Sequence, residues 1–285
     1  MKAVEQSSEA GKASVTKVCG YLGMKRDAYY KTKGRIKAQK SEEVEVIKLV
    51  RGERKIQSRV GTIKLHKHLC ADFQRLGIKV GRDRLFDILR DHGMLVKRKK
   101  VSYKTTNSYH HFHKYNNLIK ELDITAANQV WVSDITYIRT VKGFCHLALI
   151  TALYSRKIVG YDVSDSLELA GCLRALKKAL ANCKPAAGLI HHSDRGIQYC
   201  SKQYVSELTK RKIGISMTEE NHCYENAVAE RVNGILKDEF YLDQCFVNIS
   251  HAKRATKNAI DIYNNKRLHL SLGLKTPEQV YSKIV

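Results

Sequence analysis

The chain has 285 residues, with 51 Lys and Arg against 28 Asp and Glu, so it carries a formal net charge of +23 at pH 7. Hydrophobic residues make up 43% of the chain, enough for a buried core, which excludes a wholly disordered protein. No run approaches the roughly 18 apolar residues that span a bilayer, and the N-terminus lacks the apolar segment of a signal peptide. We therefore expect a cytoplasmic protein without a membrane partner.

The positive charge is concentrated in the first part of the chain. Residues 1–120 hold 29 basic and 11 acidic side chains, a net of +18, whereas residues 121–285 hold 22 and 17, a net of +5. A basic part joined to a nearly balanced part predicts one region that binds a polyanion and another with a different task. Nucleic acid is the leading polyanion, because no amphipathic or lipid anchor is found.

Helical patterns dominate the basic part. Residues 14–31 are predicted as two short helices, an amphipathic pattern over 42–52 predicts a third, and residues 61–91 predict two more around a loop. This spacing is typical of helix-turn-helix units, although a small packed helical pair has the same pattern. We expect an N-terminal helical segment over 1–40 and a second helical, DNA-binding region over 41–100.

A run of basic residues closes this part of the chain. Its members are Lys97, Arg98, Lys99 and Lys100. They are either a solvated tether or phosphate contacts, and the excess charge of the whole region favours phosphate contacts. The polar residues that follow predict a linker over 101–125.

Strand patterns begin near residue 129. Alternating β-branched and aromatic residues predict strands over 129–140, 143–153 and 156–164. The remaining elements are predicted as a helix over 167–183, a strand over 188–194, a helix over 202–212, a strand over 213–218 and helices over 227–240 and 251–268. This order predicts an α/β domain built in layers over 126–285.

The eight cysteines are scattered singly, with no Cys-x-x-Cys pair. In a reducing compartment they are predicted to be free thiols. A zinc site is the alternative at two clusters, but surface histidines explain both better. The clusters are His66, His68 and Cys70, and His110, His111 and His113.

Three acidic residues stand out by their context. Asp134 lies inside an apolar strand, Asp194 ends another strand, and Glu230 lies in an amphipathic helix. Each alone is compatible with a cap, a loop or a solvated residue, but two neighbouring strands and a helix could bring all three together. Three hard oxygen ligands suit Mg²⁺ or Mn²⁺. Two such ions about 3.5–4 Å apart promote in-line phosphoryl displacement, the chemistry of nucleases and strand transferases.

The sequence around these acids resembles a known family. The segments W-V-S-D-I-T-Y-I, H-S-D-R-G-I-Q-Y and E-N-A-V-A-E-R-V-N-G-I-L-K are similar to the DDE motifs of retroviral-integrase-like transposases, above all OrfB proteins of bacterial insertion sequences. Between the acids lie 59 and 35 residues. The likeness extends from S-V-T-K-V-C-G-Y-L-G-M-K-R-D-A-Y-Y to Y-N-N-K-R-L-H-L-S-L-G-L-K-T-P-E-Q-V-Y. It implies a ribonuclease H-like core, a mixed five-stranded sheet with flanking helices, preceded by small helix-turn-helix-like DNA-binding segments.

The resemblance also implies roles for particular residues. Asp134, Asp194 and Glu230 become the catalytic ligands of Mg²⁺ or Mn²⁺, with two ions expected. Lys237, Asn226 and Arg195 become DNA-binding residues, and His192 either contacts DNA or packs. The chain departs from the family pattern at Ala152 and Glu225, where many relatives have Asp, and it lacks the Cys-x-x-Cys zinc domain of retroviral integrases.

The implied activity is DNA transposition. Water attacks a phosphodiester at the element end, and the freed 3′-hydroxyl then attacks a second phosphodiester. The implied partners are DNA, both element ends and target, a second copy of the chain, and an upstream OrfA protein or an OrfA fusion. Two alternatives stay open at this point: a ribonuclease H-like nuclease that cuts without joining, and a noncatalytic DNA-binding inhibitor.

Overall fold

The computed structural model describes residues 14–97, 112–183, 188–219 and 226–283. The chain divides into two compact units. The first, called here the helical unit, comprises Met1–Lys55 and Gly61–Leu95, and the second, called the core unit, comprises Ile56–Val60 and Val96–Val285. No helix of the described residues is both long and apolar enough to cross a bilayer.

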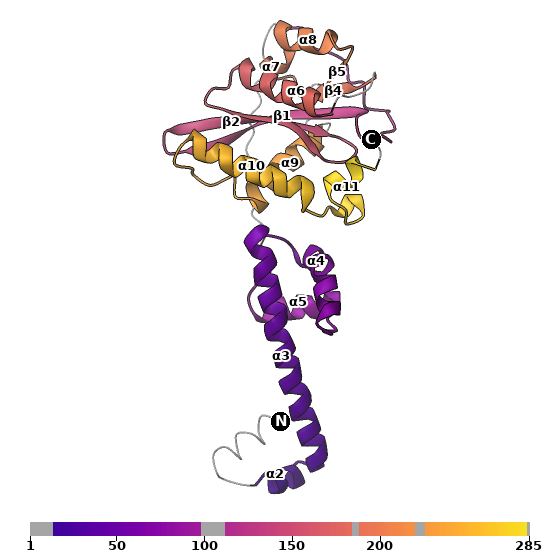
Figure 1. Cartoon of the computed structure of the whole chain (residues 1–285), viewed down its shortest axis with the longest axis vertical. Helices are drawn as coiled ribbons and strands as arrows, with labels where there is room; N and C mark the ends of the chain where they lie inside the picture. Colours follow the sequence, from indigo (N-terminus) through magenta and orange to yellow (C-terminus); the bar gives the residue numbers. More distant parts are fainter. Residues whose placement is uncertain (1–13, 98–111, 184–187, 220–225, 284–285) are drawn as a thin grey trace. The chain divides into compact units, whose positions relative to one another are not determined.

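The helical unit contains α2 (Val15–Tyr21), α3 (Arg26–Ile56), α4 (Thr62–Arg75) and α5 (Arg82–Asp91) (Figure 1). Helix α3 is continuous over 31 residues, so the expectation of a short helix ending near residue 31 and another over 42–52 is wrong. The intervening residues are mostly good helix formers, and an isolated Gly34 does not break a helix. The expected boundary at residue 40 falls inside α3, and the division into domains stays a prediction.

Small apolar clusters hold the helical unit together. Cys19 of α2 and Tyr29 of α3 are buried against each other. The ion pair between Arg84 and Glu43 joins α5 to α3, and Arg54 donates a hydrogen bond to the Met94 carbonyl (2.7 Å). Further along, buried side chains of α3, α4 and α5 include Val46, Ile47, Val50, Leu65, Leu69, Phe73, Leu85, Ile88 and Leu89.

The core unit is built on a mixed sheet of five strands in the order β3-β2-β1-β4-β5. The strands are β1 (Val130–Thr140), β2 (Gly143–Ala152), β3 (Ile158–Ser164), β4 (Ile190–Ser193) and β5 (Gly214–Met217). Strands β1, β2 and β3 pair antiparallel, whereas β4 is parallel to both β1 and β5. The predicted strands are confirmed.

Helices cover both faces of this sheet (Figure 1). They are α6 (Leu169–Cys183), α7 (Ile197–Cys200), α8 (Lys202–Thr209), α9 (Ala227–Glu239), α10 (Ile249–Asn265), the 3₁₀ turn η2 (Leu270–Leu272) and α11 (Pro277–Tyr281). Successive side chains of β2 alternate between the two cores, because Ala148 packs with α6 and Leu149 with α9 and α10. This arrangement is the ribonuclease H-like fold, as expected.

Candidate active site

The pairing of β1 with β4 brings the two aspartates together. Ser133 lies opposite Ser193 in the parallel register. Asp134 and Asp194 each follow one of these paired serines in the chain, so they lie at the same level of the sheet. Asp134 is still within β1, whereas Asp194 directly follows β4. Carboxyl ends of parallel strands meet at the same edge of a sheet, where ligands of open α/β sheets bind. The juxtaposition expected from the sequence is therefore present.

Helix α9, which carries Glu230, packs on the face of β1 to which Asp134 belongs. Ala229 of its first turn is buried against Val130 and Val132. Asn226, at the start of the helix, donates a hydrogen bond from its Nδ2 to the Ser133 carbonyl (3.1 Å). The first turn of α9 is thus fixed to the residue before Asp134, while the Glu230 side chain is exposed to solvent.

Asn233 is a site residue that sequence reasoning misses. Its Nδ2 donates a hydrogen bond of 2.7 Å to Asp134 Oδ2, and its side chain is buried. The signal was available in the spacing, because Asn233 follows Glu230 by three positions and precedes Lys237 by four. These three residues therefore share one face of α9. A buried amide on that face needs a hydrogen-bonding partner.

Electrostatics link the three carboxylates and the lysine. Burial, followed by the negative charges of Asp194 and Glu230, raises the pKa of Asp134 to about 7, although the hydrogen bond from Asn233 opposes the shift. Burial lowers the pKa of Lys237, and the charge of Asp134 opposes that shift. Lys237 therefore lies within electrostatic reach of Asp134, as its position on α9 predicts.

The turn after β4 is shaped by Asp194 itself. Its Oδ1 accepts a hydrogen bond from the Gly196 N–H (3.1 Å), and a Cβ added at Gly196 would lie 3.0 Å from the same oxygen. Arg195 donates its Nε–H to the Thr218 carbonyl (2.7 Å), which ties this turn to the end of β5. Arg195 thus has a structural contact, and its expected contact with DNA stays a prediction.

A buried polar layer supports the two strands. His191 Nε2 lies 2.7 Å from Ser133 Oγ and 3.0 Å from the Tyr204 hydroxyl. Burial lowers the pKa of His191 to about 3, so its imidazole is neutral. His192 is fully buried, with its Nδ1 2.8 Å from Ser216 Oγ, so of the two expected roles the structure favours packing.

The donors fit a hard divalent cation in their chemistry. Carboxylate oxygens are the ligands that Mg²⁺ and Mn²⁺ prefer, and a bound cation would lower the carboxyl pKa that burial and the neighbouring negative charges raise at Asp134. However, no group of three or more His, Cys, Asp or Glu side chains among the described residues has a geometry that could hold a metal ion. The weaker zinc alternative at His66, His68 and Cys70 is likewise without such a group, and His110 and His111 of the second cluster lie outside the described residues.

Other residues singled out by the sequence lie elsewhere. Lys97 is exposed, while Arg98, Lys99 and Lys100 fall outside the described residues, as does Glu225. Ala152 is buried opposite Trp131, so this departure from the family pattern lies in the core rather than among the carboxylates.

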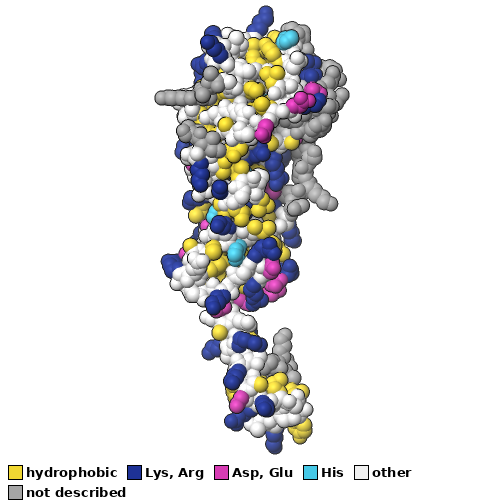
Figure 2. Space-filling model, turned by 90° about the vertical axis from the view of Figure 1, so that its right-hand side faces the viewer, with side chains coloured by type: hydrophobic (Ala, Val, Ile, Leu, Met, Phe, Trp, Pro, Cys, Tyr) yellow, Lys and Arg dark blue, Asp and Glu magenta, His cyan; other side chains and the backbone are white. Residues whose placement is uncertain are grey.

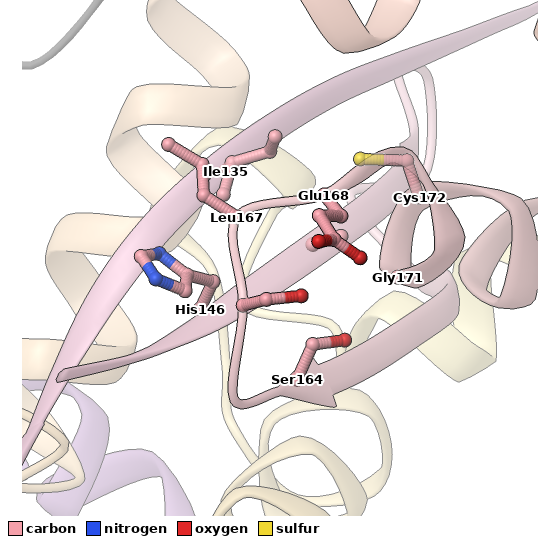
Figure 3. A pocket seen from close by; sticks show the side chains of 9 residues that line it. Ile135, His146, Ser164, Leu167, Glu168, Gly171 and Cys172 are labelled. Atoms are coloured by element: carbon pink, nitrogen blue, oxygen red, sulfur yellow. The ribbon is translucent and has the colours of Figure 1, made fainter.

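A small hollow near β1 is not part of this site (Figure 3). Asp134 accepts a hydrogen bond from Asn233 of α9. Ile135, the next residue, packs with α6 and lines the hollow. The hollow thus lies on the opposite face of the sheet. Its lining residues are Ile135, His146, Ala148, Ser164, Ser166, Leu167, Glu168, Gly171 and Cys172.

Comparisons with known proteins agree with this geometry. Residues 124–223 match a family described as "Integrase core domain", and residues 211–277 match a second family with the same description. The two matches together include both aspartates and the glutamate. The fold and these matches define a polynucleotidyl transferase with an integrase-type core.

Relatives that match most of the chain give the particular family. The chain is 36% identical over 266 residues to "Insertion element IS600 uncharacterized 31 kDa protein" of Shigella sonnei, covering 91% of this chain and 96% of that one. It is 32% identical over 236 residues to "Transposase for insertion sequence element IS904" of Lactococcus lactis subsp. lactis (strain IL1403), covering 82% and 91%. The chain belongs to the family of insertion-sequence transposases.

A solved structure is also similar to the core. The HTLV-2 integrase catalytic core domain in complex with magnesium (trimeric form) aligns with a TM-score of 0.45 and 19% identity, covering 55% of this chain and 97% of that one.

Proposed function

We propose that this transposase cuts DNA at the ends of its insertion element and joins the ends to new DNA, with Asp134, Asp194 and Glu230 as the catalytic carboxylates. The observation that carries the proposal is the placement of Asp134 and Asp194 at one level of two parallel neighbouring strands. The anchoring of α9 to β1 through Asn226 and Asn233 supports the inclusion of Glu230.

The proposed reaction has two displacements at phosphorus. In the first, a water oxygen bonds to phosphorus, the bond from phosphorus to O3′ breaks, and O3′ takes up a proton. In the second, that 3′-hydroxyl loses its proton and its oxygen bonds to a target phosphorus, the bond from that phosphorus to the target O3′ breaks, and the leaving O3′ takes up a proton. Two divalent ions, Mg²⁺ or Mn²⁺, would neutralise the phosphate charge at both steps.

The chain's own residues have distinct tasks in this proposal. The three carboxylates would hold the cations, and Asn233 orients Asp134 through its hydrogen bond. Lys237, on the same face of α9, binds a DNA phosphate beside the carboxylates. Asn226 and Arg195 lie near the DNA path, and Lys97 with the basic residues after it adds phosphate contacts. The helical segments bind DNA, and a second copy of the chain and an upstream OrfA protein or fusion complete the assembly.

The test uses a labelled element end, a target duplex and Mg²⁺. Asp194→Asn and Glu230→Gln are expected to abolish both cut and joined products while DNA binding is retained. Asp165→Asn and Glu168→Gln are matched controls, because both carboxylates are exposed and lie on the loop before α6. Parental activity in either site variant would refute the assignment.

The same assay separates the alternatives. A parental chain that yields only shortened strands is a nuclease, and one that binds the element end without any product is a noncatalytic inhibitor. Joined products that disappear in the two site variants support the transposase reaction. Removal of divalent cations by a chelator should stop both steps, and added Mg²⁺ should restore them.

A further inference from the structure

The middle of α3 is a basic helical segment that no other described element of the helical unit covers. Helix α2 packs at the start of α3, through Cys19 and Tyr29, and α5 is tied to α3 from Glu43 onward. Figure 1 shows the bare stretch between them. Between Asp27 and Glu42 the helix carries no acidic side chain.

Five basic residues occupy this stretch. Each is exposed to solvent, and Figure 2 shows Lys and Arg side chains projecting from the narrow part of the helical unit. They are Lys31, Lys33, Arg35, Lys37 and Lys40. Like charges spaced four residues apart on a helix repel each other by about 0.2–0.5 kcal/mol per pair, and a bound polyanion would relieve this repulsion.

The five side chains form two rows. Lys31 and Arg35 are four positions apart and make one row, whereas Lys33, Lys37 and Lys40 make the other at spacings of four and three. Because a helix turns by about 100° per residue, the rows are separated by roughly 200° and lie on opposite sides of α3.

The surfaces between the rows differ. Tyr29, Ile36 and Ile47 share one face of α3, because they are separated by seven and eleven positions; Tyr29 and Ile47 are buried, whereas Ile36 between them is half-buried. The opposite face carries Gly34 and Ala38, both exposed. A Cβ built at Gly34 meets no atom of the described residues within 4 Å, so within the described part of the chain this face is uncovered.

We infer that this segment of α3 binds in the major groove of duplex DNA. The major groove is about 12 Å wide and admits an α-helix of about 10–12 Å diameter, with phosphates along both walls. Two opposed basic rows match the two phosphate walls of the groove. The face between the rows carries the small residues Gly34 and Ala38, and it faces the base edges. The inference deepens the proposed function, since DNA is the substrate of that reaction.

The test measures binding of the full chain to a random 30-base-pair duplex without divalent cation, over a range of salt concentrations. Three variants are compared with the parent. The first is Lys33→Gln with Lys37→Gln and Lys40→Gln, and the second is Lys31→Gln with Arg35→Gln. The control removes three exposed lysines of the core unit, Lys177→Gln with Lys202→Gln and Lys266→Gln.

Each lost phosphate contact reduces the slope of log K against log salt concentration by about 0.9. The slope should therefore become shallower by about 2.7 in the first variant and about 1.8 in the second, while the control keeps the parental slope. Parental slopes in both α3 variants, or an equal change in the control, would overturn the inference.

Groove insertion is tested separately from charge. Ala38→Leu adds bulk to the exposed face without loss of helix propensity, and it should weaken duplex binding about tenfold. Gln39→Leu, on another side of the helix, should bind like the parent. If Ala38→Leu binds normally, or if a single strand of equal length binds as tightly as the duplex, the helix is not in the groove. Cleavage by the same variants is not needed, so failure here leaves the carboxylate assignment to its own test.

Discussion

The hydrogen bond from Asn233 to Asp134 offers the sharpest test of how the site is held. We predict that Asn233→Ala lowers the rate of strand transfer about 10- to 100-fold. A hydrogen bond to a charged group contributes about 1.5–3 kcal/mol, and the lower and upper values correspond to about tenfold and just over a hundredfold in rate. The 2.7 Å distance and the burial of Asn233 favour the full effect.

The assay compares single-turnover strand transfer at saturating DNA across a range of Mg²⁺ concentrations. Loss of the bond should also raise the Mg²⁺ concentration needed for half-maximal rate, because an unoriented Asp134 is a poorer ligand. Binding of DNA without metal should be unchanged. This pattern separates a positioning role from general loss of structure.

Asn264→Ala is the matched control for stability. Asn264 of α10 makes two hydrogen bonds of 2.9 Å to the backbone of Ile158 in β3. Its Oδ1 accepts from the Ile158 N–H, and its Nδ2 donates to the Ile158 carbonyl. Its loss should lower the free energy of unfolding but leave the rate per folded molecule near the parental value. If Asn233→Ala transfers strands at the parental rate at limiting Mg²⁺, the reasoning about Asp134 is refuted.

Three further predictions concern the frame of the site. Gly196→Ala should reduce cleavage several-fold with DNA binding intact, because its Cβ would press on Asp194 Oδ1 at 3.0 Å; parental cleavage would contradict this. Gly160→Ala should lower the free energy of unfolding by about 1–3 kcal/mol or more in denaturant titrations, since the new Cβ would overlap the Ala175 carbonyl of α6. The free energy of unfolding should fall as the pH drops from about 6.5 toward 3, by up to about 1.4 kcal/mol per pH unit. The reason is that His191 takes up a proton in the unfolded chain, whereas burial keeps its imidazole neutral in the folded one. Unfolding curves at several pH values would measure this dependence, and His191→Gln should lack this component.

The core unit could be predicted from sequence because its signals are local. Alternation of apolar and polar residues marks β1, and short apolar runs mark β4 and β5. Asp134 and Asp194 follow from the same reasoning, since a carboxylate in or after a buried strand is unusual. Once β1 and β4 are parallel neighbours, the register that pairs Ser133 with Ser193 brings the two residues to one level, and this register is given by the structure.

Other features depend on contacts between distant residues and could not be read from periodicity. The sequence does not predict that α3 is continuous, because the middle of this helix lacks an apolar stripe, the usual signal of a helix. Arg195 is a basic residue directly after Asp194, yet its Nε–H donates a hydrogen bond to the Thr218 carbonyl, a partner 23 positions away. The burial of His192, which favours packing over a contact with DNA, is likewise not given by the sequence alone.

Helix α9 shows why the site is more than its carboxylates. Asn226 fixes the helix start to β1, and Glu230, Asn233 and Lys237 follow along the same face. Rotation of the helix by one residue would turn this face by about 100°, and the amide, the carboxylate and the lysine would leave β1 together. The packing of Ala229 against β1 therefore sets the chemistry as much as the acidic residues do, because it fixes which face of α9 meets Asp134. A core substitution there, such as Ala229→Leu, is therefore expected to lower strand transfer by displacing this face from Asp134, while binding of DNA without metal stays at the parental level.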